Sequence, residues 1–191
     1  VRAEAGRCIA DLAQLGLESE IVSSDEAAAV GRLASRCGIG QHRARLSPEA
    51  KLARVRSLQA AGAVAVAVGD GINDAPVLRG ADVAIAMGRG SALAQTSADL
   101  ILVRDSLEDL PDTVRLARRT QRVIRQNLAW SVAYNLAALP LAALGFVPPW
   151  LAAIGMSLSS VAVVLNALRL SHGIPRRRGR AWTPPRPAEA A

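Results

Sequence analysis

Aromatic residues are scarce in this chain: only five occur among its 191 residues. They do not alternate with basic residues, so the stacking platforms that bind single-stranded nucleic acid are not indicated, and no nucleic-acid partner is expected. The formal net charge is nevertheless +7. With nucleic acid disfavoured, such a charge favours an anionic membrane surface or ligands that carry phosphate.

Paired metal-binding residues are also lacking. Cys8 and Cys37 lie far apart, which indicates neither a zinc knuckle nor a disulfide framework, and each is expected to be a buried helix residue. His42 and His172 have no second ligand at metal spacing and are expected to be structural or solvent-facing. No Gly-x-Gly-x-x-Gly or Walker sequence occurs, so a dinucleotide-binding or P-loop site has no support.

The most informative stretch is an apolar run at 64–68, Val-Ala-Val-Ala-Val, followed directly by Gly-Asp-Gly-Ile-Asn-Asp-Ala-Pro at 69–76. A run of this kind without polar alternation predicts a strand buried on both faces in a parallel sheet. Asp70, Asn73 and Asp74 would then stand at the carboxyl edge of the sheet, where ligands bind in such folds. Gly69 and Gly71 let the backbone bend and approach a ligand closely.

Hard oxygen ligands beside a glycine turn suit Mg²⁺ that is held together with a phosphate. The alternative is an acidic turn that only caps the following helix.

Strands alternate with helices over residues 1–106, which predicts a doubly wound α/β domain. The expected strands are 21–22, 64–68, 82–88 and 100–103, and the expected helices are 2–14, 26–37, one that begins after Ser47, and 91–98. Ser47 is the predicted N-cap of its helix with Pro48 at the first position, so that Lys51, one turn in, would point back toward the sheet edge. Asp25 could serve simply as the N-cap of helix 26–37.

From residue 107 the pattern becomes helical and basic up to residue 125, and two uncharged stretches at about 126–146 and 150–169 follow. Each is long enough to cross the hydrocarbon core of a bilayer, and Val147-Pro148-Pro149 breaks the chain between them. Arginines at both outer ends and none in the connecting loop place both ends in the cytoplasm, as in an integral protein of the cell membrane. The Arg- and Pro-rich tail, 171–191, is expected to be disordered. The alternative is a pair of buried core helices.

Polar groups inside such spans are costly and therefore candidates for function. The first span holds Tyr134 and Asn135, and the second holds Met156, Ser159 and Ser160. A thioether is a soft ligand that favours copper(I) and can be joined by amide, hydroxyl or phenol oxygens. The alternative is close packing of the two helices through their serines.

The sequence at 69–76 resembles the hinge motif of the P-type ATPases, ion pumps with a haloacid-dehalogenase-like (Rossmann-like) phosphorylation domain. The resemblance covers residues 1 to about 170 and implies that Asp70, assisted by Asp74, holds Mg²⁺, while Asn73 and Lys51 contact the aspartyl phosphate. Ser23 and Asp25 stand where the family has Thr-Gly-Asp, a loop that contacts the phosphoryl group. Ser24 replaces the glycine of that loop and loses its backbone freedom.

Tyr-Asn-x-x-x-x-Pro and Met-x-x-Ser-Ser are similar to the last two transmembrane helices of the copper(I)-exporting heavy-metal members. This resemblance implies that a path for the metal is lined by Tyr134, Asn135, Met156, Ser159 and Ser160. Copper is favoured over zinc, because a zinc exporter would be expected to show charged residues here.

The chain has no Asp-Lys-Thr-Gly-Thr phosphorylation motif, no nucleotide-binding domain and no Cys-Pro-Cys helix. The resemblance therefore implies a C-terminal part of a pump that binds ATP mainly through a missing N-terminal half, on the same polypeptide or on a partner chain. Alone, the chain is expected to hydrolyse no ATP. The alternatives are a stand-alone phosphohydrolase of the same fold and a non-catalytic membrane hairpin that binds metal or modulates a full-length pump.

Overall fold

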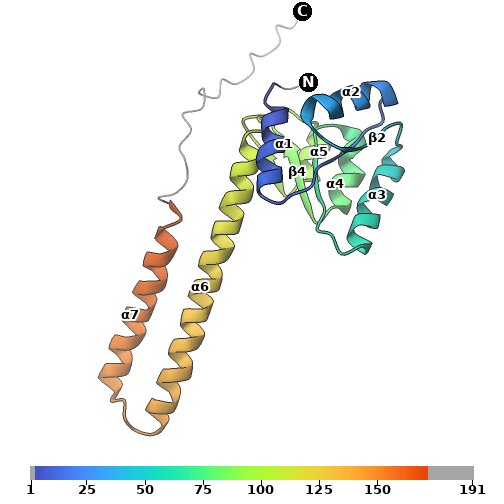
Figure 1. Cartoon of the computed structure of the whole chain (residues 1–191). Helices are drawn as coiled ribbons and strands as arrows, with labels where there is room; N and C mark the ends of the chain where they lie inside the picture. Colours follow the sequence, from blue (N-terminus) through green and yellow to red (C-terminus); the bar gives the residue numbers. More distant parts are fainter. Residues whose placement is uncertain (1–2, 172–191) are drawn as a thin grey trace, which may run out of the picture. The chain divides into compact units, whose positions relative to one another are not determined.

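The computed structural model describes residues 3–171. The chain divides into two compact units, Val1–Asp112 and Thr113–Ala191 (Figure 1). The first is an α/β unit and the second is a helical hairpin. The predicted boundaries of the soluble part, the basic helix and the hairpin stay a prediction, and the tail from residue 172 onward, including His172, lies outside the described residues.

Strands and helices alternate throughout the first unit. Its elements are α1 (Ala5–Gln14), β1 (Glu20–Val22), α2 (Ala27–Cys37), β2 (Gln41–Arg43), α3 (Pro48–Ala60), β3 (Val66–Gly69), the short 3₁₀ helix η1 (Ile72–Asp74), α4 (Ala75–Gly80), β4 (Val83–Met87), α5 (Ala92–Thr96) and β5 (Leu100–Leu102). Every predicted strand is present within a residue or two of its expected ends. The additional strand, β2, was not predicted.

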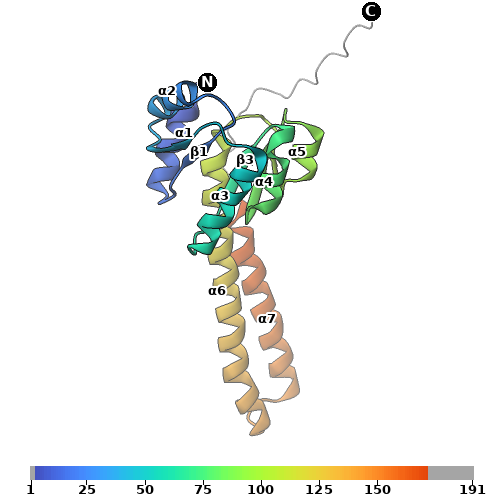
Figure 2. The ribbon, with the colours of Figure 1, turned by 90° about the vertical axis from the view of Figure 1, so that its right-hand side faces the viewer.

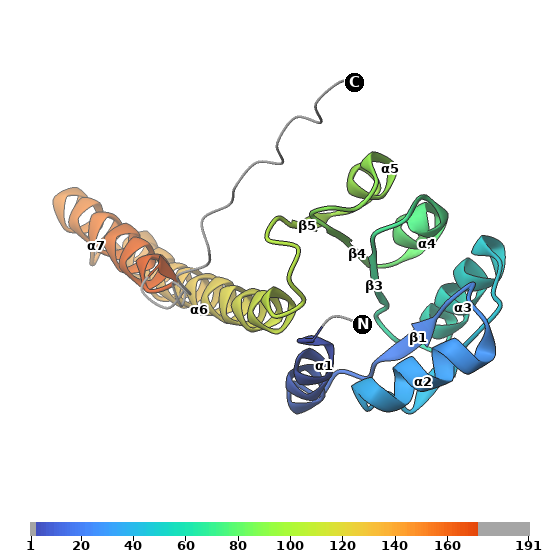
Figure 3. The ribbon, with the colours of Figure 1, turned by 90° about the horizontal axis from the view of Figure 1, so that it is seen from above.

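All strand pairs are parallel, as predicted, but the strands form two sheets rather than one. One sheet pairs β1 with β2, and the other has the order β3-β4-β5 (Figure 3). No strand of the described chain joins β1 to β3, and each of these strands therefore ends its own sheet with an unpaired edge.

The helices α4 and α5 cover one face of the three-stranded sheet (Figures 2 and 3). The strands present small side chains on this face, among them Ala84 and the partly buried Ala67. Leu78 of α4 and Ala94 of α5 pack against them. The small side chains of the strands allow the helices to approach closely, and the contact forms part of the apolar core.

The strand β3 is not buried on both faces, contrary to the prediction. Val66 and Val68 remain 48% and 41% exposed, whereas Ala65, just before the strand, is buried. The two valines share the face of β3 opposite Ala67, since side chains alternate along a strand. The prediction was wrong because β3 is an edge strand and the described helices leave this face of it uncovered.

Local chemistry sets several helix ends. The Ser47 hydroxyl accepts a hydrogen bond from the Ala50 amide at 3.2 Å, and Pro48 is the first residue of α3, as predicted. The helix α1 ends before Gly16, whose φ of +73° suits glycine. Cys8 and Cys37 are both buried in helices, which confirms that prediction.

The second unit is a hairpin of two long antiparallel helices (Figures 1 and 2). Helix α6 (Asp109–Ala143) begins in the first unit, and α7 (Pro149–Leu168) begins directly after the predicted break at Pro148. Within the described residues, α7 is the one helix whose length and apolar composition suffice to cross a membrane. The polar residues of the second half of α6, such as Asn127 and Asn135, make it less apolar.

Leu78 is 1% exposed and Leu93 is 40% exposed, although both belong to the helical layer on the sheet. We expect Leu78→Ala to lower the free energy of unfolding by about 3 kcal/mol, because it leaves a cavity between α4 and β4. Leu93→Ala is the matched control and should cost less than about 1 kcal/mol. Urea unfolding of the detergent-solubilised chain, followed by far-UV circular dichroism, measures both. If both variants lowered the free energy of unfolding equally, the assignment of Leu78 to the core and Leu93 to the surface would be wrong.

Candidate functional site

Asp70 lies at the carboxyl end of β3, as predicted. Its side chain is exposed and has no hydrogen-bond or ion-pair partner among the described residues. Its backbone is held in place, since the Ser91 amide donates to the Asp70 carbonyl at 2.8 Å. A Cβ added to Gly90 would lie 2.9 Å from the same carbonyl, so the loop before α5 packs directly on Asp70. The site thus presents a free carboxylate on a fixed backbone.

The ammonium group of Lys51 lies against the carboxylate of Asp74. Lys51 Nζ is 3.0 Å from Asp74 Oδ1, and Lys51 is only 6% exposed. The cap at Ser47 starts α3 so that Lys51 points inward, which confirms the predicted direction of this side chain. A buried ammonium needs a counter-charge, and Asp74 provides it.

Gly69 makes room for this arrangement. A Cβ at Gly69 would lie 2.9 Å from the Cβ of Asp74, and one at Gly71 would lie 3.5 Å from Asp74 Oδ2. The short helix η1 therefore folds its last residue back onto the end of β3. Asn73, within η1, is exposed. Asp74 caps no helix through its side chain, so the turn does more than start α4.

The Ser23–Asp25 loop follows β1 in the other sheet. Ser23 Oγ donates to Asp25 Oδ2 at 2.9 Å and accepts from the Asp25 amide at 3.2 Å. Ser24 does not have a positive φ, so its conformation does not require the glycine that the family usually has here. The alternative role of Asp25 as an N-cap is wrong, since α2 begins after Glu26 and has no side-chain cap.

The structure brings together only part of the predicted set. Lys51 and Asp74 are in contact, with Asp70, Gly69 and Gly71 in the same turn. Among the described residues, no hydrogen bond or ion pair links Ser23 or Asp25 to this turn.

Glu20 anchors the helix that carries Lys51, a role that the sequence analysis missed. Its carboxylate accepts hydrogen bonds from Arg54 of α3 at 2.8–3.1 Å and from Arg43 of β2 at 2.9 Å. Burial raises the pKa of Glu20, but the bonds from Arg54 and Arg43 lower it by more, so the pKa lies below its usual value. Three elements, β1, β2 and α3, thus meet at one charged cluster.

The oxygen donors at β3 fit a magnesium ion. Mg²⁺ usually keeps several waters and takes one or two protein carboxylates together with phosphate oxygens. Asp70 and Asp74 supply two such carboxylates at one turn. No group of three or more acidic, histidine or cysteine side chains suited to a metal occurs among residues 3–171, so the remaining ligands would be water and phosphate.

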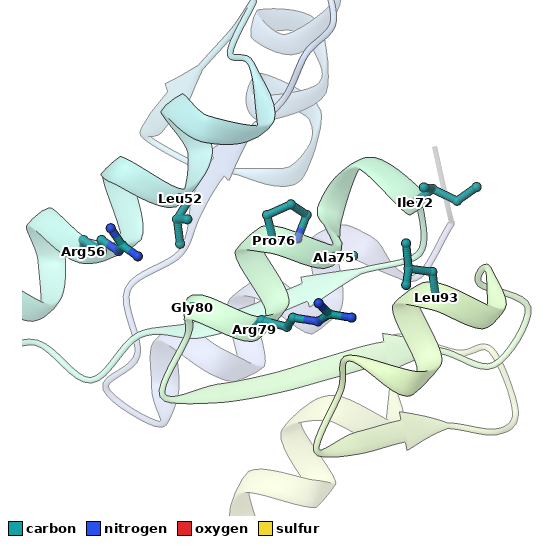
Figure 4. Close-up of a pocket in the computed structure, with 8 residues that line it drawn as sticks. All are labelled: Leu52, Arg56, Ile72, Ala75, Pro76, Arg79, Gly80 and Leu93. Carbon is teal, nitrogen blue, oxygen red and sulfur yellow. The ribbon is translucent and has the colours of Figure 1, made fainter.

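A surface pocket of about 450 Å³ lies beside the turn, between α3, α4 and α5 (Figure 4). Ile72, Ala75 and Pro76 of the hinge stretch line it, together with the exposed Arg56 of α3. Neither Asp70 nor Asp74 lines this pocket, and the carboxylates therefore face a different part of the surface.

In the hairpin, α6 and α7 meet along a seam of polar and close contacts. Trp130 Nε1 donates to Ser159 Oγ at 3.1 Å, and Asn166 Nδ2 donates to Asn127 Oδ1 at 2.8 Å. The Tyr134 hydroxyl also packs closely on α7, since a Cβ added to Gly155 would lie only 2.7 Å from it. Tyr134 and Ser159 therefore face the partner helix.

Asn135, Met156 and Ser160 lie beside the seam and are exposed. Asn135 directly follows the seam residue Tyr134, and Met156 directly follows the seam residue Gly155. In an antiparallel pair of right-handed helices, a step of about 100° beyond the seam turns both side chains toward the same side of the pair. Asn135 donates to the Ser131 carbonyl, and Ser160 donates to the Met156 carbonyl, each at 3.0 Å. This open side carries a thioether, an amide and a hydroxyl.

Comparison with known proteins identifies the fold first. Residues 1–82 match the family model described as haloacid dehalogenase-like hydrolase. A solved structure of a zinc-transporting PIB-type ATPase in its E2.Pi state superposes with a TM-score of 0.85 at 36% identity, covering 89% of this chain and 28% of that chain. A catalytic CPx-ATPase domain, CopB-B, matches with a TM-score of 0.55 at 33% identity over 57% of this chain and 44% of its own.

Two curated relatives extend the match through the hairpin. The copper-exporting P-type ATPase of Bacillus subtilis (strain 168) is 43% identical over 164 residues, which is 86% of this chain and 20% of the relative. The cation-transporting P-type ATPase B of Mycobacterium tuberculosis (strain H37Rv) is 43% identical over 166 residues, 87% of this chain and 22% of the relative. Over most of its length the chain is thus similar, in sequence and in fold, to part of these heavy-metal P-type ATPases. It spans about a fifth of the length of these relatives.

Asp74→Asn would leave the Lys51 ammonium buried without its counter-charge. We expect this change to lower the free energy of unfolding by about 2 kcal/mol, whereas Asp70→Asn, at an exposed and unpaired carboxylate, should change it by less than about 0.5 kcal/mol. Lys51→Met in the Asp74→Asn background should recover part of the loss. Urea unfolding measures all three variants, and equal effects of the two asparagine variants would argue against the ion pair.

Proposed function

We propose that this chain is part of an ATP-driven pump that exports copper(I) through a magnesium-dependent aspartyl-phosphate cycle. The turn after β3 is the observation that carries the proposal: a free carboxylate, Asp70, stands beside the Lys51–Asp74 pair at the carboxyl end of a parallel strand. Such a set of one cation and two carboxylates suits the binding of a metal and a phosphoryl group rather than the capping of a helix.

In this proposal, Asp70 and Asp74 hold Mg²⁺, which neutralises charge on the phosphoryl group when it is bound. The ammonium of Lys51 and the amide of Asn73 offset the remaining charge at the same turn. Phosphoryl transfer depends mainly on positioning and on such cations, so fixed side chains suffice for this part of the chemistry. Ser23 and Asp25, on the loop after β1, would approach the phosphoryl group from the other sheet.

The nucleophile comes from chain that this sequence does not contain. The unpaired edges of β1 and β3, with Val66 and Val68 exposed on β3, leave room for a further parallel strand from the remainder of the pump. A strand paired to β3 in parallel would end at the same edge as Asp70. An aspartate at its carboxyl end would then stand opposite the magnesium carboxylates, and ATP would be bound mainly by the remainder.

The hairpin would form part of the metal path in the cell membrane, with both of its ends in the cytoplasm. The open side bearing Asn135, Met156 and Ser160 supplies soft and neutral ligands, and no charged residue lies between Asn127 and Leu168. A thioether with neutral oxygens favours copper(I) over zinc. The zinc-transporting structural relative shares the fold, and copper is proposed from the donor chemistry and from the copper-exporting relative. Tyr134 and Ser159 would support this path from the seam.

The ATPase proposal can be tested by replacing the C-terminal fifth of the Bacillus subtilis relative with this chain. We expect copper-stimulated, magnesium-dependent ATP hydrolysis by the hybrid, and a loss of at least about a hundredfold in Asp70→Asn, because the metal loses a carboxylate. Glu18→Gln removes an exposed acid outside the site and is the control. If Asp70→Asn and Glu18→Gln hydrolyse ATP equally well, the proposed role of Asp70 is wrong.

Copper(I) binding tests the hairpin separately. Under reducing conditions, competition with a chromophoric chelator should show binding by the detergent-solubilised chain, weakened about tenfold or more in Met156→Ala because the soft ligand is gone. All variants are compared in a Cys8→Ser/Cys37→Ser background, because a free thiol would itself bind copper(I). Ser160→Ala should also weaken binding, and Ser157→Ala is its matched control because Ser157 makes the same kind of backbone bond on the far side of α7. Equal binding by all variants would overturn the metal path.

A further inference from the structure

The charges of this chain are divided unequally between its two units. Residues 1–112 carry 12 basic and 15 acidic side chains, a net charge of −3, whereas residues 113–191 carry 11 basic and one acidic, a net charge of +10. Among the described residues of the second unit there is no aspartate or glutamate. The acidic residues of α6 itself, Asp109 and Asp112, lie in its first turn, more than two helical turns before Arg122 and Arg125.

Most of these arginines share one face of α6. Residues 115, 118, 122 and 125 recur at intervals of three or four, which in a helix of 3.6 residues per turn places them in one stripe. Arg119 turns elsewhere, since its guanidinium donates to the Arg169 carbonyl on α7. Arg125 and Asn127 are two residues apart, about 200° around the helix, so Arg125 points away from the seam.

Arg122 and Arg125 are the exposed end of this stripe nearest the apolar segment. Within the described chain neither has a hydrogen-bond or ion-pair partner. With a rise of about 1.5 Å per residue, they precede the start of the uncharged run at Asn127 by about 8 and 3 Å. The headgroup layer on each side of a bilayer is about 6 Å thick, so Arg125 falls within this layer, and Arg122 lies about 2 Å outside it, within reach of its long side chain.

We propose that Arg122 and Arg125 form a binding site for the headgroup of an anionic phospholipid in the cytoplasmic leaflet. This inference rests on the membrane-spanning hairpin of the proposed function. The planar guanidinium groups match phosphate oxygens, and neither of the two has a carboxylate partner among the described residues, so both are available to a phosphate. In a zwitterionic headgroup, the ammonium group offsets the negative charge of the phosphate and weakens its attraction to arginine. A lipid with net negative charge lacks this offset and should bind the two arginines more tightly.

Trp130 provides a nearby reporter. It lies five residues beyond Arg125 and its side chain is 52% exposed. With Trp150 and Trp182 replaced by phenylalanine, Trp130 is the single tryptophan of the full chain. The chain is placed in vesicles of phosphatidylcholine and phosphatidylglycerol in which one lipid or the other is brominated in its acyl chains. Quenching of Trp130 then reports which lipid occupies the adjacent position.

We expect phosphatidylglycerol to be preferred over phosphatidylcholine by about threefold or more, and the preference to fall to about one in the Arg122→Gln/Arg125→Gln variant. The control is Arg32→Gln/Arg36→Gln, which removes two exposed arginines from α2 and should keep the preference. Equal quenching by the two lipids in the parent chain, or an unchanged preference in Arg122→Gln/Arg125→Gln, would overturn the proposal and point to an acidic surface of the remainder as the source of counter-charge.

A different failure would concern the proposed function itself. If neither brominated lipid quenches Trp130, the hairpin does not place this residue in the bilayer, and the spanning premise is wrong together with the lipid site. Quenching by both lipids without a preference keeps the hairpin in the membrane and removes only the lipid site.

Discussion

The buried ammonium of Lys51 constrains the whole arrangement around the carboxyl end of β3. Its position is set from two directions, by the Ser47 cap that starts α3 and by the bonds from Arg54 to Glu20 that hold the middle of α3 against β1. A charge placed there must have a carboxylate beside it, so Asp74 is drawn inward and η1 folds as a tight turn. Asp70, four residues earlier, is left exposed on a backbone that cannot move freely. The buried charge thus separates a carboxylate that is paired within the chain, Asp74, from one that is unpaired, Asp70.

The unpaired edges of β1 and β3 give this separation its functional meaning. A carboxylate that faces solvent on a finished domain would be unremarkable, but Asp70 stands at the end of a strand whose neighbouring edge is open and whose valines are uncovered. The free carboxylate of Asp70 lies at the carboxyl end of β3, and the unpaired edge runs along the same strand. In the proposed pump, a partner strand would pair with the free edge of β3 and bring its own terminal residue to Asp70 in a single association, which would link completion of the sheet to completion of the site.

Local chemistry was predictable from the sequence, and long-range pairing was not. The start of α3 and the inward direction of Lys51 follow from Ser47 and Pro48 alone, and the turn after β3 follows from its glycines and acids. The strand β2 was missed because Gln41, His42 and Arg43 are all polar and exposed. The exposure of Val66 depends on the position of β3 in its sheet and on which elements cover that face, and an apolar run specifies neither. Likewise, Glu20 and Arg54 meet across 34 residues without any pattern that joins them.

Helix α6 shows how one amphipathic element serves three tasks on three faces. Tyr134 and Asn127 face α7, Asn135 lies about 100° beyond Tyr134 on the open side of the pair, and Arg125 lies roughly opposite the seam. The directed contacts of the seam fix the rotation of α6 about its own axis. A rotation by one residue would move Asn135 into the seam and Asn127 out of it. The polar seam would thus set both the face that the proposed function assigns to the metal and the face proposed for the membrane surface.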